Sequence, residues 1–152
     1  MHQYAVALAN EIRRRAAEMP VSERATLYFG GGTPSLLPID DLKIIINALK
    51  ETELWREPAE VTMEMNPGTV DFAKLCQYRE MGIDRVSFGV QSLNDEELKI
   101  IGRLHTATEA LMAIEQASKA GFERISADLI FGLPTQTLAT FTDTMSTIVD
   151  SA

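Results

Sequence analysis

Three polar side chains stand in otherwise apolar, strand-like segments of this chain, each near the C-terminal end of its segment. They are Glu64, Gln91 and Asp128. A carboxylate or an amide in an apolar strand is costly to desolvate unless it is paired or faces a polar ligand. Each one alone is as readily explained by a hydrogen bond to neighbouring backbone or to an arginine. Their occurrence in three successive strands favours one shared polar pocket.

A fourth strand end carries a different signal. The segment Leu27–Ser35 runs from apolar residues into three glycines, a threonine and a proline. Such a segment is typical of a buried strand that opens into a tight loop, where bare backbone lets a ligand approach closely. The plainer alternative is that the glycines only form a tight turn. In α/β folds with parallel strands, however, ligands bind at this end of the strands.

The elements that must position these residues follow from apolar spacing. The chain is predicted to form a helix and then four strand–helix units, each about 30 to 40 residues long, which suits the crossovers of a parallel sheet. This α/β order fits a doubly wound sheet or a (β/α) barrel of the TIM type with outer helices. We favour a partial barrel, because polar residues end every strand. Strands are expected at 25–29, 60–65, 85–90 and 124–131, and helices at 4–19 with Pro20 as its end, from Asp40, from Asp71 to Gly82, and at 95–101, 108–120 and 138–149.

Composition narrows the class of protein. The chain has 152 residues, of which 45% are hydrophobic, so one domain with a real core is expected. Its formal charge of −8 and its lack of a long cationic run argue against nucleic acid as a partner. No segment is long and apolar enough to predict stable membrane insertion, which favours a cytoplasmic setting. The single cysteine, Cys76, cannot form an internal disulfide or supply a multi-thiolate metal site, and it is interpreted as a core residue.

Five motifs, taken together, resemble one family. In order and spacing they are similar to the core of radical S-adenosylmethionine (SAM) proteins of the oxygen-independent coproporphyrinogen III oxidase group. Two of them, Glu-x-Asn-Pro-Gly-Thr and Val-Gln-Ser, are more similar to the oxidase-like branch, whose members are regarded as haem chaperones. The motifs are Phe29–Ser35, Glu64–Thr69, Gly89–Ser92, Gly102–His105 and Asp128–Pro134.

The resemblance implies roles for residues that match the motifs. The family's glycine-rich loop binds the methionine end of SAM, which falls here to Gly31, Gly32 and Thr33. Free backbone carbonyls there can accept hydrogen bonds from an ammonium group, and glycine leaves room for it. Glu64 matches a glutamate that hydrogen-bonds the ribose or the amino end of the cofactor.

Three further matches complete the expected cofactor site. Gln91 corresponds to the family's strand-end glutamine, and Asp128 to a ligand-facing aspartate. Arg103 corresponds to an arginine that pairs with the SAM carboxylate, for which a planar guanidinium is suited. Without the resemblance, Arg103 is more simply interpreted as a solvated cation at a helix end. His105 is interpreted as part of an ordinary connection between helices and not as an axial haem ligand.

The chain also departs from the family pattern. Radical SAM proteins hold a [4Fe–4S] cluster on Cys-x3-Cys-x2-Cys, and this sequence contains no such triplet. The resemblance therefore implies that residues 1–152 are the central part of a barrel domain, without the cysteine-bearing strand and the C-terminal region. No metal ligand and no catalytic residue is assigned to the chain, and we expect no radical activity from it alone.

The expected function belongs to the intact protein. The resemblance favours a haem chaperone that binds SAM, the cluster and haem and delivers haem to a recipient protein. The alternative is a true coproporphyrinogen III dehydrogenase that decarboxylates a porphyrinogen to protoporphyrinogen IX. A third reading is a β/α domain that uses the same pocket for another nucleotide.

Overall fold

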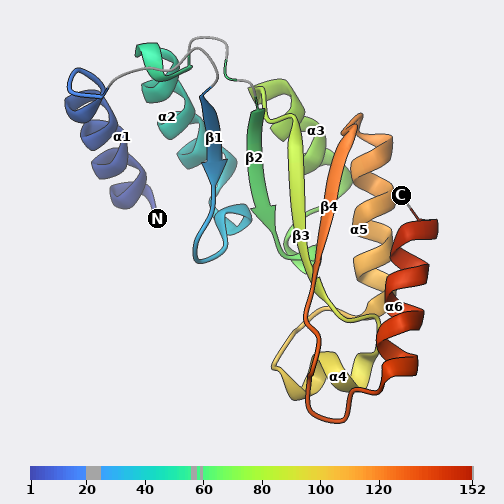
Figure 1. The fold of residues 1–152 in the computed structure, drawn as a ribbon. Coiled ribbons are helices and arrows are strands. Elements are labelled where there is room, and N and C mark those ends of the chain that lie inside the picture. Colours follow the sequence, from blue (N-terminus) through green and yellow to red (C-terminus); the bar gives the residue numbers. More distant parts are fainter. Residues whose placement is uncertain (20–24, 56–57, 59, 152) are drawn as a thin grey trace.

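The computed structural model describes residues 1–19, 25–55, 58 and 60–151, and within them helices and strands alternate along the chain (Figure 1). Three short 3₁₀ helices, at Pro34–Leu36, Glu53–Trp55 and Pro67–Thr69, lie in the connections. The strands are β1 (Thr26–Phe29), β2 (Glu60–Met65), β3 (Arg85–Gln91) and β4 (Arg124–Leu129), and the helices are α1 (His2–Ala16), α2 (Ile39–Lys50), α3 (Phe72–Met81), α4 (Asp95–Ile100), α5 (Ala107–Lys119) and α6 (Leu138–Asp150).

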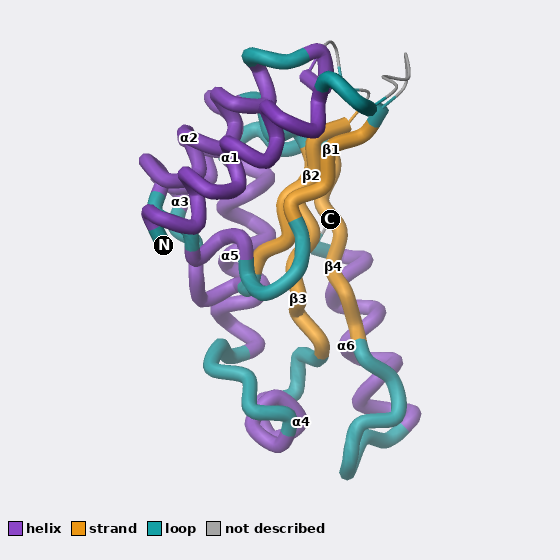
Figure 2. Tube along the Cα trace, turned by 90° about the vertical axis from the view of Figure 1, so that its left-hand side faces the viewer, coloured by secondary structure: helices purple, strands orange, loops and turns teal. Residues whose placement is uncertain are grey.

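The four strands form one parallel sheet in the order β1-β2-β3-β4. Helices α1, α2, α3 and α5 lie along one face, and α6 lies beyond the β4 edge beside α5 (Figures 1 and 2). No helical layer formed by the described residues covers the opposite face (Figure 2). A doubly wound sheet would place helices on both faces and would reverse its strand order. Sequential order with helices on one side is instead the arrangement of part of a (β/α) barrel, so the predicted fold class is confirmed.

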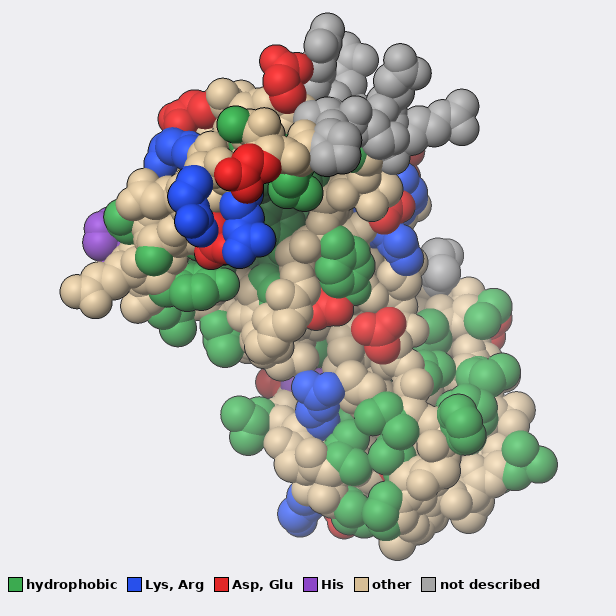
Figure 3. Space-filling view, turned by 60° about the vertical axis from the view of Figure 1, so that its left-hand side comes forward, with side chains coloured by type: hydrophobic (Ala, Val, Ile, Leu, Met, Phe, Trp, Pro, Cys, Tyr) green, Lys and Arg blue, Asp and Glu red, His purple; other side chains and the backbone are tan. Residues whose placement is uncertain are grey.

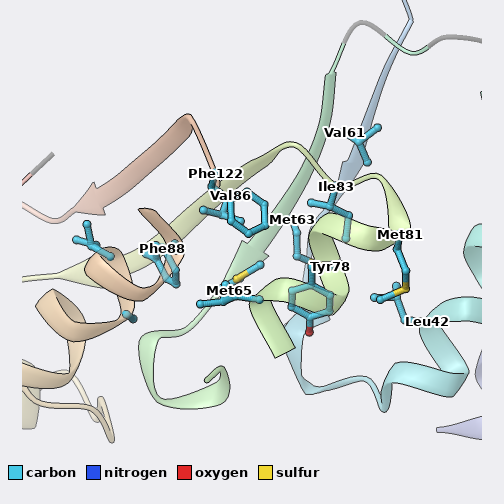
Figure 4. Packing of buried hydrophobic residues seen from close by; sticks show 14 of the residues in the cluster. Leu42, Val61, Met63, Met65, Tyr78, Met81, Ile83, Val86, Phe88 and Phe122 are labelled. Carbon is cyan, nitrogen blue, oxygen red and sulfur yellow. The ribbon is translucent and has the colours of Figure 1, made fainter. Parts of the chain in front are cut away.

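The core lies between the sheet and these helices. Strand side chains alternate between the two faces, so that Val61, Met63 and Met65 of β2 point toward the helices and are buried. Tyr78 of α3 and Phe88 of β3 are the largest side chains that are fully buried there (Figure 4). This apolar layer fixes which residues of each strand are left for the uncovered face.

The uncovered face is polar. At its amino end Arg85 and Arg124 both contact Glu60, at 3.1 and 3.2 Å, and Arg124 also pairs with Asp84. Thr62 donates to Glu60 at 2.7 Å. The polar groups at this end of the uncovered face therefore pair with one another. The cavity described below occupies the other end of the same face. No helix in the described ranges is long and apolar enough to cross a membrane.

Most predicted element ends agree with the structure. Asp71 caps α3 by accepting from Lys74 N at 2.8 Å, and Gly82 ends it with φ of 100°. The first helix is shorter than expected and ends at Ala16, while Pro20 lies outside the described residues. The last strand was predicted to run to residue 131, but β4 ends at Leu129 because the chain then turns.

Candidate functional site

An open cavity of about 200 Å³ lies at the carboxyl ends of the strands. In Figure 3 acidic side chains lie near the middle of the view, where the surface narrows between an upper and a lower lobe. Six of the seven residues predicted to hold a cofactor line this one cavity. Its walls are Gly32, Thr33, Pro34, Glu64, Met65, Asn66, Ser87, Gly89, Gln91, Arg103 and Asp128.

Glu64 joins β2 to the glycine loop. Its Oε1 accepts from the Tyr28 hydroxyl at 2.7 Å, and its Oε2 accepts from the Gly31 backbone N–H at 3.0 Å. A Cβ on Gly30 would lie 2.6 Å from the Tyr28 ring and 3.2 Å from Glu64 Oε2, so only glycine fits there. The hydrogen bond to Glu64, together with burial, raises the pKa of Tyr28. Glu64 is therefore oriented before any ligand arrives, and each oxygen keeps capacity for a further bond.

The glycine loop is held to the segment after β2. Gly31 and Gly32 have φ of 79° and 60°, a region that favours glycine. Ser35 and Thr69 share a hydroxyl hydrogen bond of 2.6 Å, and Lys74 Nζ donates to the carbonyls of both residues. Burial lowers the pKa of Lys74. The partly buried ammonium group of Lys74 thus holds the segment after the glycine loop to the segment after β2.

Gly31 is the predicted residue that does not line the polar cavity. It lines a neighbouring, more apolar cavity of about 470 Å³ between α1 and the loop, whereas Gly32 and Thr33 border both cavities. Its link to the site is the N–H that it donates to Glu64.

Gln91 ends β3 in an unusual conformation. Its φ is 71°, and Ser92 N donates to Val90 O at 2.9 Å across it, which is a γ-turn of the rare, strained kind. Here β3 is one residue longer than β4, since Phe88 pairs with Ala127 but Gln91 pairs with Leu129. This is a bulge in β3, and beyond it the Gln91 side chain lies on the same face as Ser87 and Gly89, lines the cavity and is 9% exposed.

Gly89 allows three polar side chains to meet. A Cβ at Gly89 would lie 2.9 Å from Gln91 Nε2, 3.3 Å from Asn66 Oδ1 and 3.6 Å from an Arg103 nitrogen. Arg103 donates to Asn66 Oδ1 at 3.0 Å, and Asn66 donates to the Thr33 hydroxyl at 3.4 Å. Arg103 therefore reaches the cavity wall and is not simply a solvated cation.

Asp128 is the polar residue that β4 contributes to the cavity. It is exposed, and both of its oxygens lie near the Ser87 hydroxyl of β3, at 3.2 and 3.3 Å. With Glu64 it gives the cavity two carboxylates, against the single guanidinium of Arg103. The wall can therefore receive a ligand that has cationic groups and one anionic group.

Four further residues shape this site, and the sequence alone assigned a role to none of them. Tyr28 and Ser87 lie on the same strand face as the predicted residues, and period-two alternation from Glu64 and Gln91 would have indicated that face. Asn66 and Gly89 stand in the recognised motifs but had no role assigned. The close approach at Gly89 is visible only in three dimensions.

The two residues that could in principle bind a metal or haem, Cys76 and His105, lie outside the cavity lining. Cys76 is half-buried on α3 and free, and His105 is buried and bonded to backbone. Among the described residues no group of three or more His, Cys, Asp or Glu side chains could hold a metal ion. The residues described here therefore do not fit an iron–sulfur cluster.

Comparison with known sequences gives a consistent family. The model of the Radical SAM superfamily matches residues 3–148. Heme chaperone HemW of Escherichia coli (strain K12) is 38% identical over 135 residues, which is 89% of this chain and 36% of that protein. HemW of Bacillus subtilis (strain 168) is 36% identical over 137 residues, covering 90% of this chain and 36% of the relative. The chain thus spans about a third of the length of the curated relatives it matches.

Solved structures agree with the sequence relatives. The structure of coproporphyrinogen III oxidase (HemN) from Escherichia coli, a radical SAM enzyme, superposes with a TM-score of 0.85 at 29% identity, over 99% of this chain and 35% of that one. An archaeal Elp3 from Methanocaldococcus infernus, at 19% identity and a TM-score of 0.70, covers 95% of this chain and 38% of its own and shows likeness of fold alone.

Proposed function

Because the chain belongs to the radical SAM superfamily, we propose that its polar cavity holds S-adenosylmethionine. The observation that supports this most directly is that six residues matched to the family's cofactor site border one cavity at the strand ends. The superfamily implies SAM and a [4Fe–4S] cluster: SAM would supply a reducible sulfonium, and the cluster would supply the electron that reduces it. The cluster ligands lie outside these residues, so no step of the chemistry is assigned to them.

The charges of the cavity match this ligand. SAM carries a sulfonium, an ammonium and a carboxylate, and the cavity offers two carboxylates and one guanidinium. We assign the carboxylate of the ligand to Arg103, whose planar donors suit it, and the ammonium to the carbonyls of the Gly31–Thr33 loop. Glu64 takes the ribose or amino end, while Gln91 and Asp128 supply further polar contacts.

For the intact protein we propose the function of a haem chaperone. The HemW relatives, at 36% and 38% identity over nine-tenths of this chain, support this reading. Haem and a haem-recipient protein are then its partners, and residues 1–152 form the central part of its barrel. The structural likeness to HemN supports a second candidate, oxidative decarboxylation of coproporphyrinogen III.

Calorimetric titration of the full-length protein with SAM tests the cofactor site. We expect Glu64→Gln and Arg103→Lys each to weaken binding by about tenfold or more. Glu64→Gln removes a negative charge, and Arg103→Lys keeps the positive charge but replaces the planar, two-pronged guanidinium with a single ammonium group. Glu115→Gln is the matched control, since Glu115 is an exposed carboxylate paired with Lys119 on α5. Equal affinities in all four proteins would refute the assignment.

A second experiment separates the two functions. The full-length protein, with its cluster reconstituted, is given coproporphyrinogen III and SAM without oxygen, and protoporphyrinogen IX is measured. We expect no product together with stable haem binding in the absorption spectrum. Formation of product would favour the oxidase instead.

A further inference from the structure

A buried carboxylate outside the cavity has no role in the function described so far. Glu97 lies in the first turn of α4 and is 2% exposed. It accepts from the hydroxyls of Ser92 at 2.6 Å and Thr140 at 2.7 Å, and from Gln136 Nε2 at 3.1 Å. Within the described residues it forms no ion pair, so neutral donors alone compensate its burial. The carboxylate thereby joins the start of α4 to residues about forty positions later in the chain.

Two of the three partners connect Glu97 to the strand ends that carry cavity residues. Ser92 directly follows Gln91, and it is completely buried. Gln136 Nε2 also donates to the carbonyl of Ile130, two residues beyond Asp128, at 3.2 Å. Ile130 N in turn donates to Gln91 O at 2.9 Å. Glu97 therefore connects the end of β3 to the end of β4.

A helix-capping role does not account for Glu97. Asn94 already caps α4, because its Oδ1 accepts from the backbone N–H groups of Glu96 and Glu97 at 2.9 and 3.2 Å. The Glu97 side chain points instead to residues from the β4–α6 segment and from α6.

We propose that Glu97 is a positioning residue, which holds the strained turn at Gln91 and the strand end after Asp128 in the arrangement that binds the ligand. This inference rests on the proposed function, because the ligand is SAM. Glu97 itself does not line the cavity. It acts through Ser92 on one side and Gln136 on the other.

The test compares two substitutions in the full-length protein by calorimetric titration with SAM. Glu97→Met keeps the length of the side chain but removes the one group that accepts from Ser92, Gln136 and Thr140 together, and we expect about tenfold weaker binding. Glu97→Gln keeps an amide oxygen for Ser92 and Gln136, while the Thr140 hydroxyl can turn to accept. We expect this conservative variant to bind within about threefold of wild type.

A double-mutant cycle with Gln91→Ala separates positioning from a merely structural role. If Glu97 acts through Gln91, Glu97→Met should cost much less affinity in the Gln91→Ala background than in wild type. Asp41→Asn is the control, because Asp41 is also a buried carboxylate, 6% exposed, but lies on α2 against His2. It should lower the melting temperature without changing the affinity.

The outcomes are distinguishable. Equal affinity of wild type and Glu97→Met, or an equal loss in both backgrounds of the cycle, would overturn the positioning role while leaving SAM binding intact. A loss of affinity in Asp41→Asn as large as in Glu97→Met would also overturn it. Failure of the wild-type protein to bind SAM would overturn the proposed function itself.

Discussion

The imidazole of His105 and the carbonyl of Val90 are joined by a hydrogen bond of 3.2 Å from Nε2. A carbonyl oxygen only accepts, so this nitrogen carries the proton. The same oxygen accepts from Ser92 N at 2.9 Å, and two donors therefore hold the turn in which Gln91 sits. A histidine that sequence analysis assigned to an ordinary connection thus supports the floor of the cavity.

Stability should depend on pH through this histidine. Burial lowers the pKa of His105 below its ordinary value of 6.5, so the folded protein binds this proton less readily than the unfolded chain. Its contribution to folding is therefore complete above pH 6.5 and is lost as pH falls through the lower, folded value. Chemical denaturation measures the free energy of unfolding at pH 7.5 and at pH 5.5. The difference between these two free energies should be smaller in His105→Gln than in wild type. An unchanged difference would contradict the assignment.

Adding one methyl group at Gly89 should disturb the ligand site more than the fold. In Gly89→Ala the new Cβ would press on the Gln91 amide at 2.9 Å, and a side-chain end can move aside at modest cost in stability. We expect SAM affinity of the full-length protein to fall by about tenfold. Gly68→Ala is the matched control, because its Cβ would meet only His105 Cβ at an ordinary 3.6 Å. Similar affinities for the two variants would refute this account of Gly89.

Removing the ammonium group below the glycine loop should destabilise the protein. Lys74→Met keeps the aliphatic stem but leaves the carbonyls of Ser35 and Thr69 without this donor, at a cost of about 1–3 kcal/mol in unfolding free energy. Lys43→Met removes an exposed lysine that contacts Asp40 at 3.4 Å, and should cost less than about 0.5 kcal/mol. Urea denaturation measures both values. The prediction fails if the two substitutions cost the same.

Acid should act on the protein partly through Glu97. Burial alone would raise the pKa of this carboxyl, but the hydrogen bonds from Ser92, Thr140 and Gln136 together hold it below its usual value of 4.5. Glu97 therefore stabilises the folded protein above pH 4.5, and this stabilisation is lost as the pH falls through the pKa of Glu97 in the folded state. Between pH 5 and 3, wild type should lose more unfolding free energy than Glu97→Gln. Parallel curves for the two proteins would contradict this.

The convergence of the site was predictable from the sequence because it follows from chain direction. In a parallel sheet all carboxyl ends meet at one edge, so Glu64, Gln91 and Asp128 had to be neighbours once their strands were recognised. The strand of Glu64 was predicted with its observed bounds, since Asn66-Pro67-Gly68 ends it clearly.

Features that depend on distant contacts could not be predicted. Glu97 stands in an acidic first turn, Asp95-Glu96-Glu97, and that pattern indicates a solvated helix end. It is buried because Gln136 and Thr140, about forty residues later, fold over it. The sequence gives no sign of the positive φ of Gln91 either. This φ occurs at the bulge against β4, and glutamine has no preference for it.

The salt-linked residues at the amino end of the uncovered sheet face have a consequence for biosynthesis. Glu60 pairs with both Arg85 and Arg124, so this end of the face is charged. Water can therefore wet this end of the sheet face while the chain is still being made. The helical layer can consolidate first, and a nascent chain need not hide this surface from chaperones or from its neighbours.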